Sequence, residues 1–123
     1  MQFSGSYVAL VTPWTKDLSN VDYAALKDLI DWHVESGTDG ILPAGTTGES
    51  ATLTHAEHRE LVEKTVQFVG GRCKVLAGAG SNSTNEAIEL AMHAKKAGAD
   101  SALVITPYYN RPTPEGLYRH FAT

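Results

Sequence analysis

Hydroxyl groups that could carry protons are concentrated at two places in this sequence. Thr46 and Thr47 are adjacent in the segment GTTGES at residues 45–50, and Tyr108 and Tyr109 are adjacent after a short apolar run. A threonine hydroxyl donates and accepts a hydrogen bond at once, and a tyrosine can pass on a proton without carrying charge at rest. These residue types suit general acid–base chemistry. The structural alternatives are turn-forming threonines and a core or interface tyrosine.

A second group of polar side chains comprises His55, His58 and Glu86. The two histidines share a helical face and permit a metal pair, but no third ligand with zinc-like spacing follows, so we predict no metal. We also expect no cofactor. Segment 78–83 lacks the third glycine of a dinucleotide motif, and Glu49 stands where a phosphate-binding Walker loop needs lysine. An exposed polar helix face is the plainer explanation of the histidines and Glu86.

Short apolar runs alternate along the chain with longer amphipathic stretches, which predicts an α/β fold of repeated βα units. Strands are expected near residues 7–11, 40–44, 74–78 and 101–106, each followed by a helix. Strands that are joined by helices should be parallel. Two helix starts have the spacing of a capping box. The expected N-caps are Ser19 or Asn20, Thr54 (with Glu57), Ser83 (with Glu86) and Thr113.

Polar residues follow all four expected strands, at Thr12, 45–47, 80–82 and Thr106. In a parallel arrangement these loops share one rim, which is where barrel enzymes keep their chemistry. This favours a (β/α)₈ TIM barrel over an open doubly wound sheet. A barrel takes roughly 250 residues, so residues 1–123 are expected to be an incomplete N-terminal half with about the first four βα units.

The charge balance argues against several partners. Ten Lys+Arg against fourteen Asp+Glu leave a net charge of −4 without a basic run, which disfavours nucleic acid and anionic membranes. No apolar run reaches the roughly 20 residues of a membrane-spanning helix. Cys73 is the single cysteine, and the N-terminus lacks the features of a secretory signal, so a cytoplasmic location is expected.

Three motifs together resemble the dihydrodipicolinate synthase family of pyruvate-dependent Schiff-base aldolases. They are GSYVALVTP at 5–13, GTTGES at 45–50 and PYYNRP at 107–112. The resemblance implies a TIM-barrel lyase that condenses pyruvate with aspartate semialdehyde in lysine and diaminopimelate biosynthesis. By position, Thr46 matches the hydroxyl of a proton relay and Thr47 matches the residue that binds the pyruvate carboxylate. Tyr109 matches the relay tyrosine that a neighbouring subunit inserts into the site.

The same resemblance implies a lysine feedback site between two subunits. A cationic amino acid needs a carboxylate for its ammonium group and polar donors for its own carboxylate. The matching positions are Ser50, Ala51, His55, His58, Asn82, Glu86 and Tyr108.

The sequence departs from the family pattern because the segments with the Schiff-base lysine, the second relay tyrosine and the aldehyde-binding arginine are missing. Of the lysines present, only Lys74 touches an expected strand, at its opening end. We therefore expect the chain alone to be inactive. Two alternatives stay open: an aldolase for another 2-keto acid, such as the sialic-acid lyase type, and a non-catalytic assembly module. The unpaired strand edges of half a barrel also predict self-association.

Overall fold

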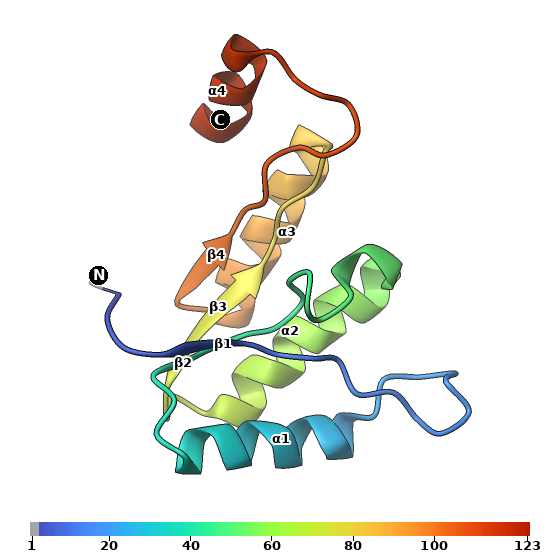
Figure 1. The fold of residues 1–123 in the computed structure, drawn as a ribbon, viewed down its shortest axis with the longest axis vertical. Coiled ribbons are helices and arrows are strands. Elements are labelled where there is room, and N and C mark those ends of the chain that lie inside the picture. Colours follow the sequence, from blue (N-terminus) through green and yellow to red (C-terminus); the bar gives the residue numbers. More distant parts are fainter. Residues whose placement is uncertain (1–2) are drawn as a thin grey trace.

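The computed structural model describes residues 3–123, which form a four-stranded parallel sheet covered by helices (Figure 1). The strands are β1 (Tyr7–Ala9), β2 (Gly40–Leu42), β3 (Lys74–Gly78) and β4 (Ser101–Leu103). They lie side by side in the order β1-β2-β3-β4, and every neighbouring pair is parallel. A doubly wound sheet reverses its strand order at a switch point, whereas a barrel adds each strand next to the previous one. The observed order is therefore that of consecutive TIM-barrel units, as predicted.

Each strand leads into a helix. The helices are α1 (Tyr23–Glu35), the short 3-10 helix η1 (Ser50–Thr52), α2 (His55–Val69), α3 (Thr84–Ala97) and α4 (Pro114–Ala122). Helix α1 packs against α2, and α2 packs against α3 and β3. Figure 1 shows α4 set apart from the sheet at the end of a long loop, and none of its residues is buried.

Three strands, β1, β2 and β4, are shorter than predicted. In β2 the pairing ends at Leu42, since Pro43 has no N–H to donate and Ala44 has a left-handed φ of 54°. The residues that the sequence pattern assigned to strand ends therefore belong to the loops that carry the polar side chains.

The prediction that Ser19 or Asn20 caps α1 is wrong. Asp22 is the N-cap, and its side chain accepts a hydrogen bond from the Ala25 backbone N–H. Trp14 and Val21 form an antiparallel bridge, which closes the residues between them into a small loop that holds Ser19 and Asn20, and the Thr15 N–H donates to the Asn20 carbonyl at 2.9 Å. The helix therefore begins after this loop, and Asp22 is itself a residue type that N-caps prefer.

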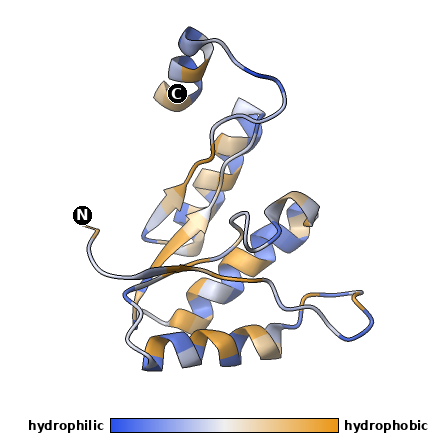
Figure 2. Ribbon diagram, viewed as in Figure 1, coloured by the Kyte–Doolittle hydropathy of each residue, from blue (hydrophilic) through white to orange (hydrophobic). Residues whose placement is uncertain are grey.

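The core lies between the sheet and the inner faces of α1 and α2, where Figure 2 shows apolar positions alternating with polar ones along each helix. Its members are fully or almost fully removed from solvent, which is the main source of folding free energy. They include Leu26, Ile30, Ile41, Leu61, Val62, Val69, Val75 and Ala77.

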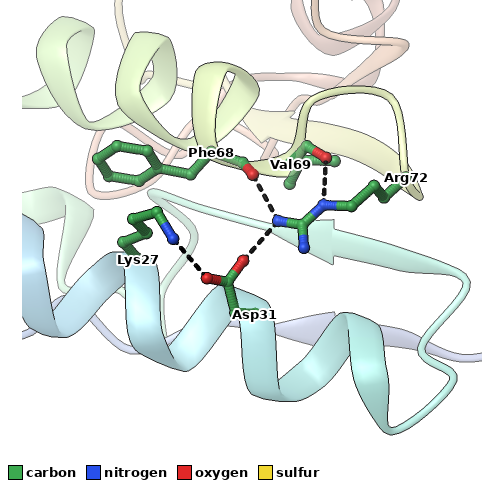
Figure 3. A network of polar contacts seen from close by, with 5 residues as sticks. All are labelled: Lys27, Asp31, Phe68, Val69 and Arg72. Carbon is green, nitrogen blue, oxygen red and sulfur yellow. Dashed lines mark hydrogen bonds and ion pairs between the residues drawn. The ribbon is translucent and has the colours of Figure 1, made fainter.

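Arg72 ties the end of α2 to the middle of α1 (Figure 3). Its guanidinium donates to the backbone carbonyls of Phe68 and Val69 at 2.6 and 3.0 Å and pairs with Asp31 at 2.5 Å. Lys27 approaches the other oxygen of Asp31 at 2.6 Å. The hydrogen bonds from Lys27 and Arg72 lower the pKa of Asp31. This network satisfies carbonyls that the end of a helix leaves open.

Candidate active site and adjoining ligand site

The loops that follow β2, β3 and β4 meet at the carboxyl end of the sheet and enclose a pocket of about 740 Å³. Parallel strands bring these loops together, so residues that lie far apart in sequence face one cavity. Most of the predicted site residues line the pocket. They are Thr46, Ser50, Ala51, His55, His58, Glu86 and Tyr108.

The GTTGES loop is held in place by a buried hydrogen bond. The Thr12 hydroxyl donates to the Gly48 carbonyl oxygen at 2.6 Å. A Cβ at Gly48 would lie 3.0 Å from the Leu10 carbonyl oxygen and 3.1 Å from the Ala44 nitrogen, so only glycine fits this close approach easily. The packing of two loops against each other therefore explains the second glycine of the motif.

Thr46 and Thr47 lie on the outward side of this loop, and both are exposed. The turn is closed by backbone groups, since the Glu49 N–H donates to the Thr46 carbonyl at 3.0 Å and the Ser50 N–H to the Gly45 carbonyl at 3.2 Å. Backbone closure of the turn leaves the Thr46 hydroxyl available at the pocket. Thr47 lies beside it in the chain but is not among the lining residues.

Tyr109 does not line the pocket that Thr46 lines. Its side chain is 95% exposed, and its backbone has a left-handed φ of 70°. The segment is attached to the loop after β3, because the Asn110 amide donates to the Asn82 carbonyl at 3.2 Å. Tyr108, in contrast, lines the pocket. Within residues 3–123, Tyr109 is therefore not part of a core.

Glu86 is the charged centre of the second predicted group. One carboxylate oxygen lies 2.8 Å from His55 Nε2, and the other accepts a hydrogen bond from the Ser81 hydroxyl. Ser81 is buried and was not among the predicted site residues. The signals for it were its place in the polar loop 80–82 and two residues before an expected N-cap, and neither shows where its hydroxyl points.

His58 lies beneath this pair on α2 and is only 6% exposed. Burial, followed by the neighbouring His93 and His55, lowers the pKa of His58. Its Nδ1 is buried and has no hydrogen-bond partner. A neutral imidazole therefore lines the pocket with one ring nitrogen unpaired.

Residues 3–123 contain no cluster of three or more His, Cys, Asp or Glu side chains that could hold a metal ion. In the same part of the chain, no helix has the length and apolar character needed to cross a membrane.

The lysines of the chain offer no amine for Schiff-base chemistry at the pocket. Lys74 opens β3 at the far end of the strand and pairs with Asp100 at 2.7 Å. The hydrogen bond and the charge of Asp100 raise the pKa of Lys74, which keeps its amine protonated. A protonated amine is not a nucleophile.

Comparisons with known proteins agree with this geometry. A sequence profile of the dihydrodipicolinate synthetase family matches residues 2–123. The chain is 57% identical over 120 residues to the 4-hydroxy-tetrahydrodipicolinate synthase of Bradyrhizobium diazoefficiens. The alignment covers 98% of this chain and 40% of the relative. The chain thus spans about 40% of the length of this curated relative.

Solved structures show the same relationship. A dihydrodipicolinate synthase from Acinetobacter baumannii, complexed with pyruvate, superposes with a TM-score of 0.92 at 50% identity, over 95% of this chain and 40% of that one. The enzyme of Cyanidioschyzon merolae with lysine bound superposes with a TM-score of 0.90 at 46% identity. The superposition covers 96% of this chain and 40% of that one. These findings do not favour a sialic-acid lyase or an assembly module, and the chain belongs to the dihydrodipicolinate synthetase family.

Proposed function

We propose that this chain forms the first four βα units, and with them part of the substrate-binding rim, of a lyase that condenses pyruvate with aspartate semialdehyde in lysine and diaminopimelate biosynthesis. The observation that carries the proposal is the GTTGES loop, which the buried Thr12–Gly48 bond holds with Thr46 at the pocket. The curated relative from B. diazoefficiens bears the name of this synthase, and the A. baumannii structure contains pyruvate.

The residues have distinct roles in this proposal. A lysine amine adds to the keto carbon of pyruvate and water leaves, which forms the imine. Thr47 binds the pyruvate carboxylate through its hydroxyl, and Thr46 passes protons between two tyrosines. One of these is Tyr109, whose 95% exposure suits insertion into the site of a neighbouring subunit. The reactive amine is not supplied by residues 1–123.

The adjoining pocket supports a second part of the proposal, a feedback site for lysine. The Glu86 carboxylate suits the ammonium of a cationic amino acid, and the side chains around it can donate to the ligand carboxylate. The C. merolae enzyme has lysine bound, and this supports the assignment. The proposed contacts are Ser50, Ala51, His55, His58, Asn82, Glu86 and Tyr108.

Location and assembly complete the proposal. Cys73 is the single cysteine among residues 1–123, which suits a reducing cytoplasm. Self-association is proposed because the Tyr109 side chain is 95% exposed and Tyr109 does not line the pocket of its own chain.

The test is a chimera in which this chain replaces the 120 aligned residues of the B. diazoefficiens synthase. We expect the chimera to consume pyruvate only when aspartate semialdehyde is present and to lose activity as lysine is added. The variant Glu86→Gln should keep the condensation and lose the response to lysine. A folded chimera without condensation activity would refute the proposed function. Equal lysine responses in the chimera and in Glu86→Gln would refute the feedback site alone.

A further inference from the structure

Helices α2 and α3 both begin with an N-cap hydroxyl residue followed three positions later by a glutamate, but the two glutamate side chains have different hydrogen-bond partners. At the start of α2, the Glu57 carboxylate accepts from the Thr54 backbone N–H at 2.7 Å, and the Thr54 hydroxyl accepts from the Glu57 N–H at 3.2 Å. This closes the predicted capping box. At the start of α3 the box is half formed. The Ser83 hydroxyl accepts from the Glu86 N–H, but the Glu86 carboxylate does not return to the Ser83 N–H.

Ser81 accounts for the difference. Its hydroxyl oxygen accepts from the Ser83 backbone N–H at 3.1 Å, which is the donor that Glu86 would take in a complete box. The same hydroxyl donates its proton to the Glu86 carboxylate. Ser81 is 2% exposed, so the hydroxyl is fixed by packing. The predicted box of Ser83 and Glu86 is thus wrong in its second half because a buried side chain competes for it.

The result is a carboxylate that faces the pocket. Glu86 keeps one oxygen on Ser81, and its other oxygen lies beside His55, whose side chain is 64% exposed. An exposed histidine is easily displaced by a ligand, whereas the buried serine is not. Ser81 therefore supplies the fixed contact, and His55 the exchangeable one.

We infer that Ser81 is a positioning residue that keeps Glu86 out of its own helix cap and turned toward the pocket, and thereby sets the affinity for a cationic amino acid. This inference rests on the proposed lysine site. Without the Ser81 hydroxyl the Ser83 N–H loses its acceptor, and the Glu86 carboxylate is the nearest replacement, as Glu57 is in α2. The variant then gains a complete capping box, which preserves the helix.

The chimera tests this with three substitutions. Ser81→Ala should raise the lysine concentration for half-inhibition at least about tenfold, since a hydrogen bond to a charged group is lost. Ser81→Thr keeps the hydroxyl, so its lysine concentration for half-inhibition should stay near that of the parent chimera. Glu57→Gln weakens the matched cap of α2, away from Glu86, and should also leave the lysine response unchanged. The kcat and the KM for pyruvate should be the same in all three, which separates positioning from general damage.

A crystal structure of the Ser81→Ala chimera gives the second readout. The Glu86 carboxylate is expected on the Ser83 N–H and away from His55. An unchanged Glu86 position together with an unchanged lysine response would overturn the inference. If the parent chimera condenses its substrates but is not inhibited by lysine, the proposed feedback site is wrong. The crystal structure of Ser81→Ala then tests the positioning role alone. A Glu86 carboxylate bound to the Ser83 N–H supports that role, and a Glu86 carboxylate that still faces the pocket overturns it.

Discussion

The Thr12 hydroxyl donates to the Gly48 carbonyl across 36 residues and joins the loop after β1 to the GTTGES loop after β2. Thr12 is 5% exposed, so water does not compete for this bond. The two loops are thereby fixed to each other at the carboxyl end of the sheet. The position of Thr46 at the pocket depends on this contact, because Thr46 lies in the turn that Gly48 helps to close.

Thr12→Val should destabilise the chimera by about 1–3 kcal/mol, because it removes the donor from a buried carbonyl and leaves that carbonyl unsatisfied. The kcat/KM for pyruvate should fall as well, since the loop that carries Thr47 loses its anchor. Urea denaturation and steady-state kinetics measure the two effects. Thr12→Ser retains the hydroxyl donor and should recover most of the stability and most of the kcat/KM for pyruvate. A Val variant that matches the parent protein would mean that the loop is held by other contacts.

Thr46→Val should lower kcat by about 10²-fold or more while the fold survives, as general acid–base relays typically contribute this much. The turn does not need the hydroxyl, since backbone bonds from Glu49 and Ser50 close it. Thr38, before the opposite end of β2, offers the matched control Thr38→Val, which should keep full activity. Unchanged turnover in Thr46→Val would show that the hydroxyl carries no proton.

His58 should make the folded protein sensitive to mild acid. Its pKa is lowered from the usual 6.5, so below about that pH the unfolded chain takes up a proton that the folded protein resists. The free energy of unfolding should therefore decrease as the pH falls below this value, until the folded His58 is also protonated. His58→Gln should flatten this part of the stability curve. Identical slopes in the parent and His58→Gln would contradict the effect.

The isolated 123-residue chain should self-associate if it is ordered. Within residues 3–123, β1 and β4 each lack a second strand neighbour, and Leu103 and Ile105 are 48% and 46% exposed. Free strand edges and exposed apolar side chains both favour pairing with another chain. The simplest form is a dimer in which two half-barrels complete eight strands by two-fold symmetry. Sedimentation at low concentration is the measurement, and a compact monomer that unfolds cooperatively would disprove the association.

The sequence predicted the parts of the fold that depend on local chemistry. The parallel strands, the complete cap at Thr54 and the Thr113 cap follow from residue type and periodicity. The parts that it missed depend on loop contacts that periodicity and residue type do not reveal. Asp22 became a cap because Trp14 pairs with Val21, and Glu86 was redirected by the buried Ser81. The roles of Thr46, Thr47 and Tyr109 stay predictions, since they concern groups that residues 1–123 do not supply.

The most direct test of the central claim is to trap pyruvate on the chimera with borohydride and to locate the adduct by peptide mass spectrometry. We propose that this chain provides the substrate rim and not the nucleophile. We therefore expect one reduced pyruvate adduct per subunit, on a lysine contributed by the B. diazoefficiens segment, and none on the isolated chain. An adduct on Lys74 or on any other lysine of residues 1–123 would contradict it, and so would a folded chimera that traps no pyruvate.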